Sequence, residues 1–283
     1  MSIELMREIA AKMTGTGIPV EPQQFRQAFE ASCEQRSYGS AYLLEHAHRM
    51  MAGYLSGLKD TLYPTWHLLV GEDRIPYFWK SVEPNSLAMP LAMLKATRGT
   101  YIDLYQAENY AQALLLGDQR WIDHYQNGGN LWDLVREAYE ASGDMPSDMK
   151  EDFFKGAYGT FSRRFSKAFP ELSTKVLEYQ NRSDIRTLYG SSINRIKINR
   201  PSTKLRLACV HSIKDTIRMA VLGAYQETGV APYCIHHDGC IAPPHVAEAY
   251  AAQFRKLGFR VGLLHPQSPV KPHTRFQLIE ADV

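Results

Sequence analysis

The chain has 283 residues, a length that fits one large domain or two small ones, and its hydrophobic fraction of 45% is ordinary for a globular protein. Its four cysteines form no CxxC pair, which argues against a structural zinc site or a disulfide framework. No apolar run approaches the roughly 18 residues of a membrane span, and the acidic start is unlike a signal peptide. We therefore expect a cytoplasmic protein with no membrane partner.

The net charge of +2 hides an uneven distribution. Residues 150–206 contain 13 Lys and Arg against 5 Asp and Glu, a net +8, and the rest of the chain carries −6. A basic segment with acidic flanks is typical of a protein that holds an anionic partner at one place on its surface. A solvated helical face explains the same segment equally well from charge alone.

The predicted elements mix helices and strands without regular alternation. Apolar residues recur at helical spacing through 4–60, with a break at 15–19, and short aromatic runs at 63–82 predict a hairpin. Beyond these, the pattern predicts strands at 99–105, 259–265 and 275–280, a hairpin at 231–242, and helices at 108–116, 130–142, 147–158, 203–228 and 244–257. This order excludes a doubly wound parallel sheet and predicts an α+β fold.

Two aspartates stand at predicted strand ends. Asp103 ends the strand Tyr101-Ile-Asp, and Asp238 lies at the tip of the hairpin at 231–242. Carboxylates on adjacent strand ends can hold Mg²⁺, which prefers carboxylates together with substrate phosphate oxygens. Each aspartate by itself is more typical of a turn or a helix cap.

A third candidate lies in the basic segment. Lys150, Phe154 and Tyr158 follow one another at steps of four, so they share one face of a helix. A lysine followed by two aromatic rings can present a charge to phosphates and rings to a base. A buried aromatic stripe with an extended lysine at its edge explains the same spacing.

Taken in chain order, these segments resemble motifs of the family A DNA polymerases. The stretch Asp103-Leu-Tyr-Gln106-Ala-Glu108 is similar to motif A, Lys150-x3-Phe154-x3-Tyr158-Gly159 to motif B, and His237-Asp238 to motif C. Two more stretches have family counterparts: Arg195-x3-Asn199-x-Pro201 before a long helix, and Arg74 with Glu83-Pro-Asn85 upstream of motif A. The matches span about residues 70–242 in the order that the family has.

The resemblance implies an α+β right-hand polymerase, with a palm of antiparallel sheet and helices, helical fingers and a reduced N-terminal helical thumb. It divides the chain into a helical N-terminal region (1–60), a first part of the palm with motif A (61–118), fingers with motif B (119–186) and a second part of the palm with motif C (187–283). Nothing resembling a 3′–5′ exonuclease precedes this core, so we expect synthesis without proofreading. A small thumb predicts weak binding of the primer-template, and a second protein subunit is one source of the missing DNA contacts.

The implied activity is DNA-directed DNA synthesis, in which a dNMP from a dNTP is added to the 3′-hydroxyl of a DNA primer-template. Asp103, Asp238 and the backbone carbonyl of Leu104 would hold two Mg²⁺ ions. Lys150 would neutralise charge that builds up on the phosphates.

The resemblance also assigns contacts to the substrates. Phe154 and Tyr158 would stack on the incoming nucleotide, which Gln106 and Glu108 would also contact, and Glu108 with Tyr158 would exclude a 2′-hydroxyl. On the primer-template side the implied residues are His237, Arg195, Asn199 and Arg74, with Arg195 and Asn199 reading minor-groove acceptors common to all correct pairs.

The chain departs from the family at three positions. Pro146 replaces the arginine expected four residues before Lys150, Gly239 replaces the glutamate of motif C, and Thr203 replaces the glutamine expected after Asn199. A proline suits the first turn of a helix, so we expect the helix of motif B to start late and to lack one phosphate ligand.

Other functions remain open at this point. Single-subunit phage-type RNA polymerases share the aspartate of motif A, the lysine and tyrosine of motif B and the His-Asp of motif C, and Gly239 fits their motif C at least as well. Glu108 and Gln106 fit the DNA enzymes instead. A primase-like polymerase and a non-catalytic accessory subunit are the remaining alternatives, and a compact polymerase without proofreading favours a phage or plasmid origin.

Overall fold

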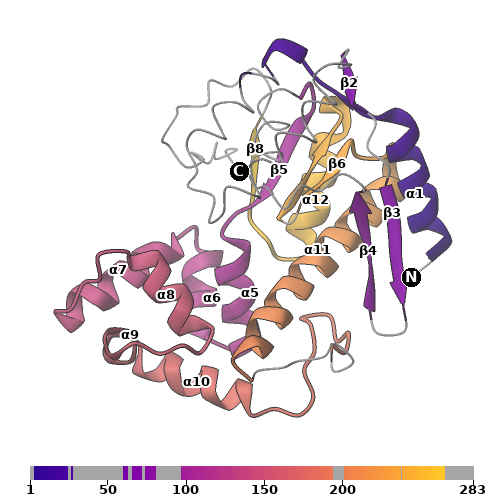
Figure 1. The fold of residues 1–283 in the computed structure, drawn as a ribbon. Coiled ribbons are helices and arrows are strands. Elements are labelled where there is room, and N and C mark those ends of the chain that lie inside the picture. The colour runs from indigo at the N-terminus through magenta and orange to yellow at the C-terminus, as the bar shows by residue number, and fades with distance from the viewer. Residues whose placement is uncertain are drawn as a thin grey trace. The chain divides into compact units, whose positions relative to one another are not determined.

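The described part of the chain forms two compact units. The computed structural model describes residues 3–24, 27, 60–62, 66–71, 74–80, 97–193, 201–236 and 238–264. Unit 1 contains Met1–Leu69, Pro76–Tyr105 and Thr216–Val283, and unit 2 contains Val70–Ile75 and Gln106–Asp215. Figure 1 labels most of the elements of both units. Among the described helices, none is long and apolar enough to cross a membrane.

Unit 1 is built around a four-stranded antiparallel sheet with the strand order β6-β7-β5-β8. Its strands are β5 (Thr100–Leu104), β6 (Cys234–Ile235), β7 (Gly239–Ala242) and β8 (Val261–Leu264). In the register, Asp103 on β5 pairs with Gly239 on β7 and with Gly262 on β8. Helix α12 (Ala247–Lys256) packs against β5, β7 and β8 and buries Tyr250 and Phe254. The sheet therefore fixes the position of Asp103 from both sides.

The N-terminal elements are a helix and short strands. Helix α1 (Ile3–Thr16) buries Met6, Ile9 and Met13 along one face, and it ends within the break predicted at 15–19. Strand β1 (Ile18–Pro19) pairs with β2 (Thr61–Leu62). Strands β3 (Trp66–Gly71) and β4 (Arg74–Lys80) form a two-stranded sheet, which confirms the hairpin predicted at 63–82. Most of the helical pattern predicted up to residue 60 lies outside the described residues.

Unit 2 is helical. Its helices are α5 (Ala107–Leu116), α6 (Gln119–Gln126), α7 (Leu131–Ser142), α8 (Met149–Ala157), α9 (Arg163–Ala168) and α10 (Pro170–Gln180). Phe153 is fully buried among aromatic rings, with ring-centroid distances of 5.6 Å to Trp121 and 5.4 Å to Phe169. A Cβ on Gly156 would lie 2.2 Å from the ring of Phe165, so only glycine lets α9 pack this closely on α8.

Helix α11 (Lys204–Thr228) follows a short 3₁₀ turn at Pro201–Thr203, and the boundary between the units falls within it. Leu205, Ile213 and Val221 are buried at the helical spacing that the sequence predicts.

The α+β prediction is confirmed. The structure also confirms the predicted strands at 99–105 and 259–265, the hairpin at 231–242 and the five helices that follow residue 107 in the prediction. Helices α6, α9 and α10 were not predicted, because α6 is largely polar and α9 has only six residues. The strand at 275–280 lies outside the described residues, and the thumb, palm and finger boundaries remain predictions.

Candidate active site

Two carboxylates meet at one hydroxyl in unit 1. Side chains two residues apart on a strand point to the same face, so Tyr101 and Asp103 of β5 lie together. Asp238 comes from the turn between β6 and β7. The hydroxyl of Tyr101 lies 2.9 Å from Oδ1 of Asp103 and 3.1 Å from Oδ1 of Asp238. The structure thus brings together the two aspartates singled out from the sequence, whereas their catalytic role remains a prediction.

The backbone holds this arrangement from the side of the turn. The amide of Leu104 donates to the carbonyl of Asp238 at 2.8 Å, and the amide of His236 donates to the carbonyl of Gly239 at 2.8 Å. The ring of His236 meets the ring of Tyr101 edge-on, with centroids 5.4 Å apart. Its Nδ1 lies 4.0 Å from Oδ1 of Asp238. The turn is therefore tied both to the central strand and to the aromatic ring beside it.

Asp103 is a buried carboxyl beside a second carboxyl, so its surroundings oppose its ionised form. Burial raises the pKa of Asp103 well above its ordinary value, the neighbouring Asp238 raises it further, and the hydrogen bond from Tyr101 acts in the opposite direction. Burial, followed by the two carboxylates, also raises the pKa of Tyr101, so its hydroxyl remains a donor. A bound cation would neutralise the negative charge of the two ionised carboxylates.

The donor set fits a Mg²⁺ ion whose coordination shell is completed by substrate. Among the described residues, no three His, Cys, Asp or Glu side chains converge into a ready-made cation cage. Mg²⁺ is commonly bound by only one or two protein carboxylates, with water and substrate phosphates filling the other positions. Asp103, Asp238 and the carbonyl of Leu104 supply ligands of this chemistry.

Gly239 has a steric explanation. A Cβ at this position would lie 2.0 Å from the carbonyl oxygen of Ile102 on the paired strand β5. Strands β5 and β7 approach so closely here that no side chain fits. The glutamate of motif C is therefore excluded by the packing beside Asp103.

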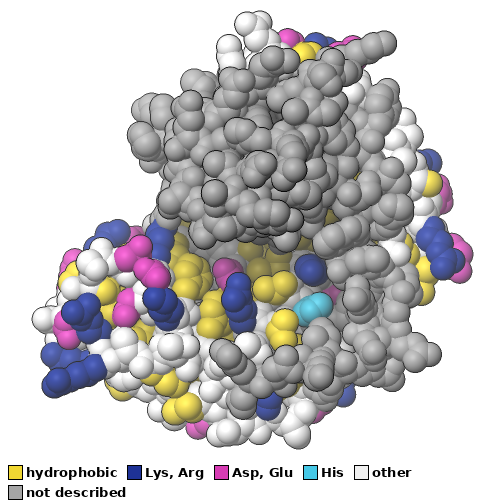
Figure 2. Space-filling view, in the orientation of Figure 1, with side chains coloured by type: hydrophobic (Ala, Val, Ile, Leu, Met, Phe, Trp, Pro, Cys, Tyr) yellow, Lys and Arg dark blue, Asp and Glu magenta, His cyan; other side chains and the backbone are white. Residues whose placement is uncertain are grey.

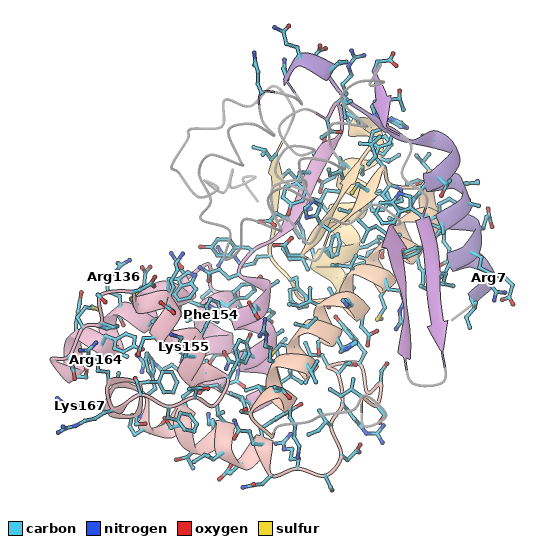
Figure 3. All side chains as sticks on the ribbon, in the orientation of Figure 1. Arg7, Arg136, Phe154, Lys155, Arg164 and Lys167 are labelled. Carbon is cyan, nitrogen blue, oxygen red and sulfur yellow. The ribbon has the colours of Figure 1, made fainter. Side chains whose placement is uncertain are left out.

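A second group of candidate residues lies on α8 and its C-cap in unit 2. The rings of Phe154 and Tyr158 are nearly parallel, with centroids 6.1 Å apart and planes 7° apart. The Nζ of Lys150 lies 5.1 Å from the ring centroid of Trp132, and that indole also meets Phe154 edge-on at 5.4 Å. Figure 3 labels Phe154 on this helix. All four side chains are partly exposed, so α8 and its C-cap, together with Trp132 of α7, present one charge and several rings.

The ends of α8 are set by local chemistry. Asp148 is the N-cap, and its side chain accepts a hydrogen bond from the amide of Glu151 at 2.9 Å. Pro146 precedes this cap and is not in the first turn, so the helix does begin after the proline. Gly159 follows the C-cap with φ of +91°, and a Cβ there would lie 1.7 Å from the side-chain nitrogen Nε2 of Gln180. The positive φ favours the glycine of motif B, whereas the near atom belongs to the end of a flexible side chain.

Glu108 and Tyr158 are joined directly. The hydroxyl of Tyr158 donates to Oε1 of Glu108 at the start of α5. Burial, then Cys209, then Glu108 raise the pKa of Tyr158. The buried side chain of Gln112 donates from Nε2 to the carbonyl of Ala157 at 2.7 Å, which ties α5 to the end of α8. The structure therefore pairs the two residues that the resemblance assigned to the sugar.

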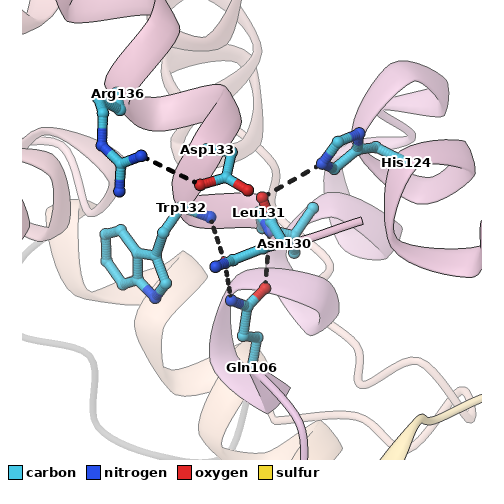
Figure 4. Close-up of polar contacts among 7 residues, drawn as sticks. All are labelled: Gln106, His124, Asn130, Leu131, Trp132, Asp133 and Arg136. Carbon is cyan, nitrogen blue, oxygen red and sulfur yellow. Dashed lines mark hydrogen bonds and ion pairs between the residues drawn. The ribbon is translucent and has the colours of Figure 1, made fainter. Parts of the chain in front are cut away.

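Gln106 has a structural task. It is the one residue other than glycine with a positive φ in the described part of the chain, at 49°. Its Nε2 donates to Oδ1 of Asn130, and its Oε1 accepts from the amide of Leu131 at 2.8 Å, as Figure 4 shows. Asn130 in turn caps α7 by accepting from the amide of Trp132 at 3.0 Å. Gln106 therefore fixes the start of the helix that carries Trp132, and its predicted contact with nucleotide remains a prediction.

The basic segment is partly neutralised. Lys155 pairs with Glu151 at 2.6 Å, and Arg164 pairs with Asp144 at 2.9 Å. Figure 2 shows the Lys and Arg side chains of unit 2 interspersed with Asp and Glu on the face in view. Lys167 points away from α9 in Figure 3. Much of the segment therefore has the character of a solvated helical face.

Four predicted contacts to the primer-template cannot be placed. His237, Arg195 and Asn199 lie outside the described residues, and Arg74 lies in β4 but its side chain is outside them as well.

Three residues that contact the candidate groups were missed from the sequence: Tyr101, Trp132 and Asn130. Tyr101 stands two residues before Asp103, and this same-face spacing is the one indication that the sequence offered. Asn130 stands at the start of the helix predicted at 130–142, where asparagine is typical of an N-cap. For Trp132 the sequence offers no comparable pattern.

Comparison with known proteins identifies the fold. No family model matches the chain, and no curated protein matches it in sequence. Among solved structures, the chain is similar to the POL domain of Pol1 from M. smegmatis, determined in complex with a DNA primer-template and dNTP. The TM-score is 0.65 at 11% sequence identity, over 92% of this chain and 69% of that one. The chain therefore has the fold of a polymerase domain.

Proposed function

We propose that the protein is a template-directed nucleotidyltransferase, a DNA-dependent DNA polymerase that adds a dNMP to a primer 3′-hydroxyl. The observation that carries this proposal is the convergence of Asp103 and Asp238 on the hydroxyl of Tyr101. The likeness to a polymerase domain bound to primer-template and dNTP supports it.

Two Mg²⁺ ions held by Asp103, Asp238 and the carbonyl of Leu104 would supply an activated primer hydroxyl and charge neutralisation on the triphosphate. The protein itself places the two carboxylates on the paired elements β5 and the β6–β7 turn, so little reorganisation is needed when substrate arrives.

The residues of unit 2 suit the nucleotide. Lys150 offers an ammonium to the phosphates, and the parallel rings of Phe154 and Tyr158 offer stacking surfaces to a base. The hydrogen bond from Tyr158 holds the carboxylate of Glu108 in one place, as discrimination against a 2′-hydroxyl requires. Template pairing would then select the base.

RNA synthesis is less well supported. Beyond the motif residues that both classes share, Gly239 was the residue that fitted the RNA enzymes at least as well, and the close approach of Ile102 explains that glycine without reference to the product. Glu108, paired with Tyr158, favours deoxynucleotides.

The test is extension of a labelled primer-template by the full chain with Mg²⁺ and either dNTPs or rNTPs. We expect extension with dNTPs, only by nucleotides complementary to the template. Preference for rNTPs, or synthesis without a primer, would overturn the proposal in favour of an RNA or primase-like enzyme. No extension with either set, even in the presence of partner proteins, would indicate an accessory subunit.

A further inference from the structure

The hydroxyl of Tyr101 contacts both of the carboxylates that are candidate metal ligands. It lies within hydrogen-bond distance of Oδ1 of Asp103 and Oδ1 of Asp238. The two carboxylate oxygens therefore lie within two hydrogen-bond lengths of each other. Tyr101 stands outside the motifs that carry the resemblance to polymerases.

The hydroxyl is held in place by its surroundings. Tyr101 is 5% exposed and lies on the central strand, where it pairs with Ile241 of β7 and Leu264 of β8. The edge-on ring of His236 packs against it. The packing around the covered ring restricts movement of the hydroxyl away from the carboxylates.

A phenol has one proton and can donate it to one carboxylate oxygen at a time. When both are ionised, as metal binding requires, two carboxylates this close repel each other. With the donor present, each carboxylate is stabilised when it stays within hydrogen-bond distance of the hydroxyl of Tyr101. The hydroxyl thus opposes the separation that their charges favour.

We propose that Tyr101 is a positioning residue for the metal site: its hydroxyl keeps Asp103 and Asp238 convergent before divalent cations bind. This inference rests on the proposed function, since it concerns the same carboxylates. Tyr101 acts through the two aspartates and supplies no ligand of its own.

The expected effect on metal affinity follows from the behaviour of residues that hydrogen-bond to metal ligands. Tyr101→Phe keeps the ring and its packing against His236 and removes only the hydroxyl. Loss of such a partner weakens metal affinity by about 10- to 100-fold. The matched control is Tyr250→Phe on α12. It removes another buried hydroxyl, which donates to the carbonyl of Val230 at 2.7 Å.

The experiment is titration of the full chain with Mn²⁺, without nucleotide, with free Mn²⁺ followed by electron paramagnetic resonance. We expect Tyr101→Phe to raise the Kd for Mn²⁺ by about 10- to 100-fold. Tyr250→Phe should keep the affinity of the wild type, and Asp238→Asn should show the largest loss. Circular dichroism checks folding, and if Tyr101→Phe does not fold, Tyr101→Met serves as the second hydroxyl-free variant, because methionine fills irregular space.

The outcomes separate this inference from the proposed function. Unchanged affinity in Tyr101→Phe, together with a loss in Asp238→Asn, would overturn the positioning role and leave the metal assignment standing. Equal weakening in Tyr101→Phe and Tyr250→Phe would show a general structural effect and would also overturn it. If the wild type binds no Mn²⁺, or Asp238→Asn binds it equally well, the metal assignment fails and the positioning role fails with it.

Discussion

The two groups of candidate residues are built in different ways. In unit 1, Asp103 and Asp238 come from a strand and a turn that are distant in sequence, and one buried hydroxyl lies against both. In unit 2, Lys150, Phe154 and Tyr158 come from a nine-residue helix and its C-cap, where they stand at steps of four. The first group depends on tertiary pairing, and the second depends mainly on local structure.

The difference indicates a division of tasks. A buried carboxylate on a central strand, with a second carboxylate held beside it by a turn, suits charge stabilisation in a chemical step, because prearranged charges need no rearrangement. Partly exposed side chains on a helix suit a substrate that arrives and leaves. Substitutions in unit 1 should therefore reduce the chemical rate, and those in unit 2 should change nucleotide affinity and selectivity.

The largest effect is expected for Asp238→Asn. Loss of one metal ligand removes several kcal/mol of transition-state stabilisation, so single-turnover extension should fall by about a thousandfold or more. Folding and DNA binding, followed by circular dichroism and fluorescence anisotropy, should be nearly unchanged. Retained extension in this variant would remove Asp238 from the metal site.

Lys150→Ala should have the next largest effect, here on the substrate side. Without the ammonium, dNTP incorporation should drop by about 100-fold in kcat/KM, as removal of one charge-stabilising donor typically does. The matched control is Lys155→Ala on the same helix, whose ammonium pairs with Glu151 at the surface. If both variants lose the same activity, Lys150 contributes only to the general charge of the helix.

Glu108→Ala should alter selectivity more than rate. Removing the carboxylate that accepts from Tyr158 frees space at the sugar, so the ratio of rNTP to dNTP incorporation should rise by about tenfold or more. Glu140→Ala, an exposed glutamate on α7, is the control and should keep the ratio of the wild type. An unchanged ratio in Glu108→Ala would mean that another group excludes the 2′-hydroxyl.

The smallest effect concerns Gln106 and is one of stability. Alanine removes both hydrogen bonds to the start of α7 and keeps the unfavourable positive φ, whereas glycine removes the bonds and tolerates that φ. Gln106→Ala should thus be less stable than Gln106→Gly by about 1 kcal/mol in urea unfolding. Equal stabilities would show that the left-handed conformation relaxes once the side chain is gone.

The sequence was most informative where function depends on local spacing. Lys150, Phe154 and Tyr158 share a face because a helix repeats about every 3.6 residues, and nothing beyond that period is needed to predict it. The strand at Asp103 and the turn at Asp238 were also predicted, because β-branched runs and a His-Asp-Gly turn are local patterns.

Contacts between distant segments were not predictable in the same way. Tyr101 meets Asp238 across 137 positions through the pairing of β5 with β7, and no single pattern in the sequence encodes that register. The contact of Trp132 with Lys150 requires the packing of α7 on α8, and the left-handed φ of Gln106 is unusual for a residue other than glycine. The steric reason for Gly239 likewise appears only when both strands are placed.

The most direct test of the central claim is to locate the cation itself. Fe²⁺ substituted for Mg²⁺ reduces added hydrogen peroxide to hydroxyl radicals that cut the chain near the bound ion, and ascorbate regenerates the Fe²⁺. We predict cuts near both Asp103 and Asp238, lost on addition of excess Mg²⁺ and absent in Asp238→Asn. Cuts confined to other parts of the chain, or cuts at these two sites that persist in Asp238→Asn, would contradict a metal site formed by this carboxylate pair.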